Sequence, residues 1–96
     1  MGLTTYEDIK QEILDDWDNI TEDDIHQIAD GYVPVYYSDI IKEWQDLPME
    51  YTDTWQDFGI SEDTTIFKLM GYDLFNYYYQ LTEKVFREVE EERDNA

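Results

Sequence analysis

The sequence predicts an all-α protein, elongated and acidic, with three short helices followed by one long C-terminal helix. Apolar residues recur at helical spacing in four segments of the chain. Hydroxyl residues followed by acids precede three of these segments, which is typical of helix starts. We expect a single domain, 1–96, because the chain has 96 residues. Hydrophobic residues make up 42% of it and aromatic residues 17%, which is too much apolar material for a disordered acidic tail.

Two short helices are expected at the N-terminus. The first covers about residues 5 to 17, where Thr5 can cap the helix start. Its apolar face consists of Tyr6, Ile9, Ile13 and Trp17. The second covers about residues 22 to 30, with Thr21 before it and Gly31 as a left-handed residue at its end.

A third helix is expected between a Val33-Pro34 break and Pro48, because proline suits a first helical turn but not a helix interior. Its inward residues are expected to be Tyr37, Ile40, Ile41, Trp44 and Leu47. Residues 49–60 show no clean period and are expected to form a loop, with a helical turn and with Trp55 and Phe58 as aromatic anchors.

The last and longest helix is expected over residues 62–91, capped by Ser61. Its apolar residues are Ile66, Leu69, Met70, Leu74, Tyr77, Tyr78, Leu81, Val85 and Val89. Such a helix is about 45 Å long at about 1.5 Å per residue. A compact domain of this size has a radius of gyration of only about 12 Å, so the molecule should be elongated.

Residue types that carry catalysis or bind metals are sparse. The chain has no Cys, and the sole histidine, His26, therefore has no zinc partners and is expected on the surface or between helices. Ser38 and Ser61 have no partner histidine in a triad-like context. Acids occur throughout the chain, so no particular pair indicates a general acid and base. We expect no enzyme, no metal site and no cofactor.

The net charge is the unusual property of this chain. It has 25 Asp and Glu against 6 Lys and Arg, which gives a formal net charge of -19. Solubility requires a net charge of only about 2 to 8 in a small domain, and self-repulsion destabilises the compact state. Two plainer explanations are an acidic composition inherited from a salt-rich host and a merely solvated surface. The sharper hypothesis is that the negative field binds a basic partner, namely a nucleic-acid-binding protein rather than nucleic acid itself.

The expected helices place acids on their outward sides, so an acidic stripe along a rigid rod can approximate a row of phosphates. Two copies of the chain would carry about -38, the charge of roughly 65 Å of duplex DNA axis. This favours a protein that imitates DNA. The candidate DNA-mimic acidic surface consists of Glu7, Asp8, Glu12, Asp15, Asp16, Asp18, Glu22, Asp23, Asp24, Asp30, Asp57, Glu62, Asp63, Asp73, Glu83 and Glu88.

The centre of the chain reads IHQIAD at residues 25–30, then Val33-Pro34, then YYSDI at residues 36–40. These segments and their spacing resemble the Ocr family of phage antirestriction proteins. The resemblance implies an all-helical homodimer that mimics bent B-form DNA and occupies the DNA-binding groove of host type I restriction-modification enzymes. It also implies a dimer interface on the helix after Val33-Pro34, formed by Tyr37, Ile41, Trp44 and Gln45. The shorter first helix and acidic tail of this chain depart from the family.

Two alternatives to this function remain. The first is a DNA mimic aimed at another host DNA-binding protein, such as another defence methyltransferase of the BREX kind, a nucleoid protein or RNA polymerase. The second is a small structural or scaffolding protein of a virion. No apolar run approaches the roughly 18 residues of a membrane span and no signal peptide is recognisable, so the host cytoplasm is the expected location.

Overall fold

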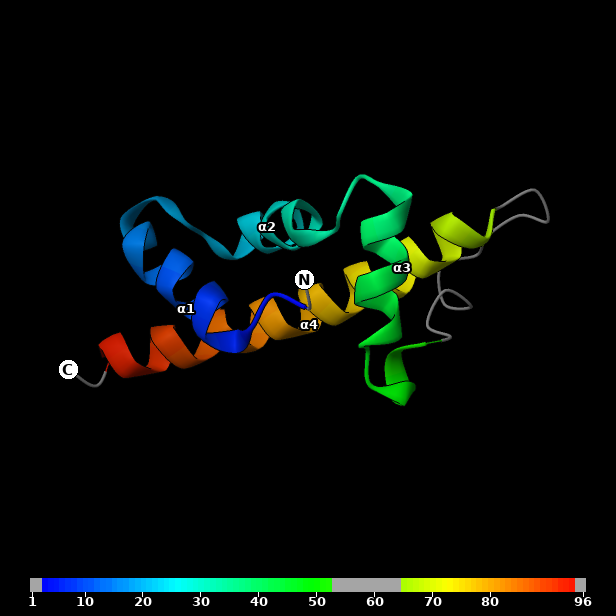
Figure 1. Ribbon diagram of the computed structural model, residues 1–96. Coiled ribbons are helices and arrows are strands. Elements are labelled where there is room, and N and C mark those ends of the chain that lie inside the picture. The colour runs from blue at the N-terminus through cyan, green and yellow to red at the C-terminus, as the bar shows by residue number, and fades with distance from the viewer. Residues whose placement is uncertain (1–2, 53–64, 95–96) are drawn as a thin grey trace.

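The computed structural model describes residues 3–52 and 65–94, and all of its regular elements in these ranges are helical (Figure 1). The α-helices are α1 (Tyr6–Asp15), α2 (Ile25–Tyr32), α3 (Tyr37–Gln45) and α4 (Ile66–Asp94). Short 3-10 turns lie at Trp17–Asn19, Glu22–Asp24 and Met49–Tyr51. The predicted order of three short helices and one long one is confirmed.

Helix α4 runs the length of the molecule and carries the other three helices (Figure 1). Helix α1 packs on its C-terminal half, α3 crosses its N-terminal half and α2 lies between them. The principal extents are 48 × 28 × 22 Å and the radius of gyration is 14.4 Å. The latter exceeds the roughly 12 Å of a compact domain of this length, so the predicted elongation is confirmed.

The core consists of the apolar faces of all four helices. Its buried members are Ile9, Ile13, Ala29, Ile40, Leu47, Leu74, Tyr78, Val85 and Val89. Most of these positions follow from helical periodicity. Ile66 was predicted on the apolar face of the last helix, but it lies in the first turn of α4 and is 60% exposed. In the run of three tyrosines, Tyr78 is fully buried, and its neighbours Tyr77 and Tyr79 are half-buried.

The first helix starts as predicted, but the second does not, because Thr21 caps the 3-10 turn Glu22–Asp24 and α2 begins only at Ile25. Thr5 accepts a hydrogen bond from the Asp8 backbone N–H, and Asp8 accepts one from the Thr5 backbone N–H. The same reciprocal arrangement joins Thr21 and Asp24. Helix α1 ends at Asp15, two residues earlier than expected. These caps fix where the acids of each first turn are presented.

The predicted end of the second helix is wrong. Gly31 lies within α2, which continues to Tyr32 and is capped by Val33. The extra residues are stabilised by the Tyr32 ring, which packs 5.6 Å from the Tyr78 ring. Pro34 likewise lies in the connection rather than in a first turn, since α3 begins at Tyr37.

The long helix begins at Ile66, four residues later than predicted. Thr65 occupies the position before it, and its Oγ1 accepts a hydrogen bond from the Lys68 backbone N–H at 3.3 Å. The predicted cap Ser61 and the loop anchors Trp55 and Phe58 lie outside the described residues. No helix in the described ranges is long and apolar enough to cross a lipid bilayer.

Candidate functional site

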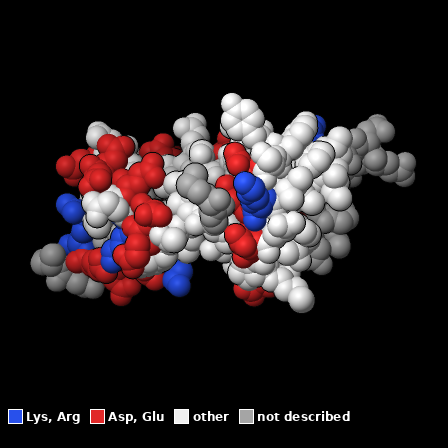
Figure 2. Space-filling view, in the orientation of Figure 1, with Lys and Arg blue, Asp and Glu red and all other residues white. Residues whose placement is uncertain are grey.

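Carboxylates gather at one end of the molecule, over α1, the 3-10 turns that follow it and the C-terminal half of α4 (Figure 2). We call this region the acidic surface. Its residues are Glu7, Asp8, Glu12, Asp15, Asp16, Asp18, Glu22, Asp23, Asp24, Glu83, Glu88, Glu90, Glu91 and Glu92. Side chains from both ends of the sequence meet here because α1 packs on the last turns of α4.

The opposite end, formed by α3 and the first half of α4, carries few charges on the face shown (Figure 2). Between Ile66 and Leu81 the only acid is Asp73, and it is buried. The expectation that every helix turns acids outward is therefore wrong for the first half of α4. The molecule has a strongly acidic end and a less charged end, where the acids of α3 and the turn after it are fewer and are partly balanced by Lys42 and Lys68.

Asp73 was predicted on the acidic surface, but its exposed fraction is 1%. Its Oδ2 accepts a hydrogen bond of 2.8 Å from Nε1 of Trp44. The side chain lies where α3 crosses α4, so it joins two helices instead of facing solvent. Helical spacing alone does not show this, because an Asp among apolar residues looks like a solvent-facing position until its partner is known.

The other predicted acids fall into three groups. Most of those in residues 7–24 are exposed, whereas Asp24, Glu83 and Glu88 are half-buried. Asp30 lies on α2, away from the acidic surface and beside a groove described below. Asp57, Glu62 and Asp63 lie outside the described residues. Sequence reasoning missed three acids of this surface in the last turns of α4: Glu90, Glu91 and Glu92. Glu91 and Glu92 could have been found, because they lie three and four residues after Glu88 and so share its helix face.

Few of these carboxylates are paired with a base. In the described ranges Lys10 Nζ lies 3.3 Å from a Glu92 oxygen. Arg87 pairs with Glu22 and, at 3.7 Å, with Glu90. The other two bases at this end lie over aromatic rings instead: Lys84 Nζ is 5.9 Å from the Tyr6 ring centre and the Arg93 guanidinium carbon is 5.8 Å from that of Trp17. The acidic surface therefore keeps a strong negative charge.

Neutral donors bind several of the acids. Three tyrosine hydroxyls donate hydrogen bonds to glutamates on other helices, in the pairs Tyr6–Glu88, Tyr32–Glu12 and Tyr78–Glu43. The hydrogen bond to Glu88, with burial, raises the pKa of Tyr6 to about 12. Burial and the hydrogen bond to a glutamate raise the pKa of Tyr32 and of Tyr78 in the same direction. Each phenol therefore stays neutral, and able to donate, to a higher pH than a free tyrosine.

We expect the protein to lose stability in alkali because of these tyrosines. In the unfolded chain a phenol loses its proton near pH 10.0, whereas folding raises the pKa of Tyr6 to about 12. A raised folded pKa stabilises the fold fully below the unfolded value and loses that contribution as the pH rises towards the folded value. Urea unfolding at successive pH values should show the free energy of unfolding falling from about pH 10 to about pH 12.

The matched control for this titration is the double variant Tyr6→Phe, Tyr32→Phe, in which the fall should be shallower because two of the shifted phenols are gone. A stability that stays constant to pH 12 in the native protein would contradict the hydrogen-bonded, neutral phenols.

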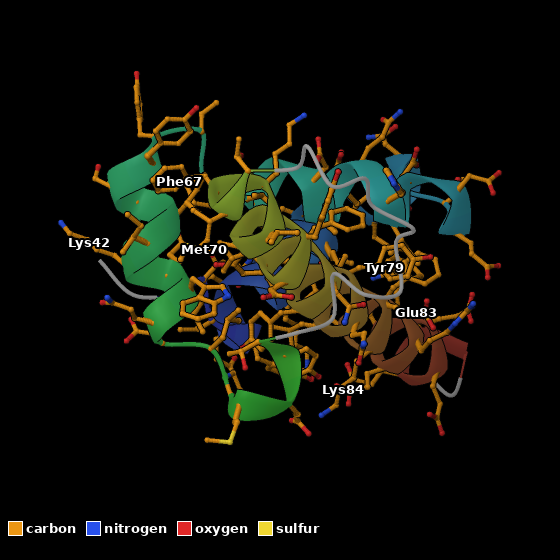
Figure 3. The ribbon with its side chains drawn as sticks, turned by 90° about the vertical axis from the view of Figure 1, so that its right-hand side faces the viewer. Lys42, Phe67, Met70, Tyr79, Glu83 and Lys84 are labelled. Carbon is orange, nitrogen blue, oxygen red and sulfur yellow. The ribbon has the colours of Figure 1, made fainter. Side chains whose placement is uncertain are left out.

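Exposed apolar side chains gather at the less charged end. We call them the aromatic surface: Val35 (86% exposed), Tyr36 (73%), Tyr37 (63%) and Ile66 (60%). Figure 3 views this end, with Phe67 beside the start of α3. The Tyr37 and Phe67 rings stack at 4.3 Å with an angle of 9°.

An open groove of about 630 Å³ adjoins the aromatic surface between α2, α3 and the first turns of α4. Its lining includes Asp30, Tyr37, Phe67, Lys68 and Phe75. The predicted interface residues Tyr37 and Gln45 are exposed, whereas Ile41 and Trp44 are half-buried. His26 is exposed as well, at the groove, with its ring 4.9 Å from that of Phe75.

Within residues 3–52 and 65–94 no group of three or more metal-binding side chains is arranged to hold an ion. Comparison with known proteins adds no relative: no family model, curated protein or solved structure matches the chain. The features that bear on function are the acidic surface, the aromatic surface and the sequence between Ile25 and Ile40.

Proposed function

We propose that this protein is a DNA mimic that occupies the DNA-binding groove of host type I restriction-modification enzymes and so protects phage DNA. The acidic surface is the observation that carries the proposal. Nine of its carboxylates come from residues 7–24, on α1 and the turns that follow it, and five come from residues 83–92 on α4, against which α1 packs. Helices hold side chains at regular intervals, so the charges form an array of fixed geometry, as phosphates do on a duplex.

Inhibition by this mechanism requires occupancy alone. The enzyme's groove carries the basic residues that neutralise DNA phosphates, and a mimic presents carboxylates to the same residues. The proposal therefore includes no catalysis and no cofactor. It also predicts that the protein avoids nucleic acid, because a net charge of -19 is repelled by phosphates.

Type I enzymes are the proposed target because of the sequence resemblance to the Ocr family. The residues that carry it form most of α2 from its start at Ile25, the connection through Val33 and Pro34, and the first turn of α3. These elements set the direction of α3 relative to α2 and present the aromatic surface.

A homodimer is part of the proposal, with the aromatic surface as its interface. Two molecules of charge -19 repel each other at close range, and this repulsion is weakest at the less charged end. Its exposed apolar side chains would be covered in such a contact. The two acidic surfaces would then point away from each other and extend the array of charges.

A competition experiment tests the proposed function. A labelled duplex containing the recognition site is bound to a purified type I methyltransferase core, and the protein is added in increasing amounts. We expect the duplex to be displaced and methylation to stop in parallel, because both ligands use one groove. A ternary complex of enzyme, duplex and protein, or unchanged methylation, would refute occupancy of the DNA site.

A further inference from the structure

The tyrosine–glutamate pairs connect helices that are distant in sequence. Tyr6 on α1 donates to Glu88 on α4, and Tyr32 on α2 donates to Glu12 on α1. Both glutamates belong to the acidic surface, and each phenol ring is anchored in the protein: Tyr6 and Tyr32 pack against the core.

A hydrogen-bond donor cancels the charge of a glutamate only if the donor is itself positively charged. Where Lys10 meets Glu92, or Arg87 meets Glu22, the ion pair cancels one negative charge of the surface. A phenol hydroxyl is neutral, so it restrains a carboxylate without cancelling its charge. The carboxylate also retains free lone pairs for a second donor, since two oxygens offer about four acceptor sites.

We propose that Tyr6 and Tyr32 are positioning residues of the acidic surface, which hold Glu88 and Glu12 in place while leaving their charge available to a cationic partner. This inference rests on the proposed function, and it explains how two glutamates of the acidic surface are kept in fixed positions. A glutamate has several rotatable bonds, and a free one must be ordered when a partner binds. Ordering it beforehand removes that cost, which corresponds to a gain of about twofold to tenfold in affinity for each glutamate.

Removing the tyrosine hydroxyls should weaken binding to a rigid partner more than binding to a flexible partner. The groove of a DNA-binding enzyme has cationic groups at fixed positions, so it gains from carboxylates that are already in place. An unstructured oligo-arginine peptide adapts to any arrangement, and its binding depends on the number of charges. Removing the hydroxyls changes the positions of the glutamates but leaves the net charge at -19.

The test uses the double variant Tyr6→Phe, Tyr32→Phe, which keeps both rings. The matched control is Tyr51→Phe, because the Tyr51 hydroxyl donates to Gln80 rather than to a carboxylate and lies outside the acidic and aromatic surfaces. Binding of each protein is measured to a purified type I methyltransferase core and to an oligo-arginine peptide. We expect the double variant to bind the methyltransferase about tenfold more weakly and the peptide within about twofold of the native protein. Tyr51→Phe should match the native protein for both.

Two results would overturn the inference: undiminished binding of the methyltransferase, or an equal loss for both probes, which would indicate a general loss of fold. Carbon-13 relaxation of the glutamate methylene groups supplies a readout that needs no partner. Glu12 and Glu88 should be ordered in the native protein and mobile in the double variant. If the native protein fails to bind the methyltransferase, the proposed function fails, and this relaxation measurement still decides whether the tyrosines position the glutamates.

Discussion

Raising the salt concentration from about 50 to about 200 mM should weaken the complex with a type I methyltransferase by about 10³-fold. Proteins that replace about 6 to 10 phosphate contacts lose about 10³- to 10⁵-fold in this range. We expect the lower figure, because the carboxylates are spread over a surface rather than spaced along a duplex. Titration calorimetry at four or five salt concentrations would give the slope.

The stability of the free protein should increase with salt, whereas its affinity for the enzyme decreases. Screening reduces repulsion among the charges of a protein at -19, so the melting temperature of the free protein should rise over the same range. This separates weaker binding from unfolding. An affinity that changes less than about threefold would show that apolar contacts, not carboxylates, hold the complex.

Replacing Trp44 with alanine should lower the free energy of unfolding by about 3 kcal/mol, the low end for Trp→Ala in a core, because Trp44 is half-buried. The indole packs against the core and donates to buried Asp73. Its loss therefore opens a cavity and removes a donor from a buried carboxylate. The melting temperature should fall by about 12–24 °C in a domain of this size, measured by circular dichroism.

Two comparisons separate these effects. Trp44→Phe keeps much of the ring volume and removes the donor, so we expect a smaller loss of about 1–2 kcal/mol. Tyr36→Ala, at a side chain that is 73% exposed, should change stability by no more than about 0.5 kcal/mol. If Trp44→Ala left stability unchanged and only dissociated a dimer, Trp44 would serve the interface rather than its own core.

The position of Trp44 also affects how a dimer is tested. Ile41 and Trp44 were predicted at the interface together with Tyr37 and Gln45, but the first two are half-buried in the protomer. Substitutions there would confuse folding with association. Tyr37 and Gln45 are exposed, so changes at these positions are the cleaner probes of self-association in sedimentation experiments.

Local sequence signals predicted most of the fold. The Thr5–Asp8 and Thr21–Asp24 pairs act within four residues, so their outcome does not depend on tertiary structure. The long period through Leu74, Tyr78, Val85 and Val89 specified the last helix, and these residues are buried as that pattern requires. Capping and periodicity predicted the structure correctly where the contacts that determine it join residues close in sequence.

The errors occurred where a distant residue decides the outcome. Gly31 remains in a helix because Tyr32 packs on Tyr78, far along the chain. Asp73 is buried because Trp44 supplies a donor from another helix. Helical periodicity could place acids on a helix face, but it could not show that α1 and the end of α4 meet to form one acidic surface.

The most direct test of DNA mimicry compares two triple variants of equal charge. One removes exposed acids of the acidic surface by Glu7→Gln, Asp18→Asn and Asp23→Asn. The other removes exposed acids at the opposite end by Asp39→Asn, Asp46→Asn and Glu50→Gln. Both carry a net charge of about -16, so a response to overall charge would be the same in the two.

The measurement is the salt dependence of binding to one type I methyltransferase core. If the acidic surface replaces DNA phosphates, the slope of log affinity against log salt should fall by up to about 2.7 in the first variant, or about 0.9 for each lost contact, and should stay unchanged in the second. Equal slopes in the two variants would contradict the acidic surface as the part of the molecule that stands in for DNA.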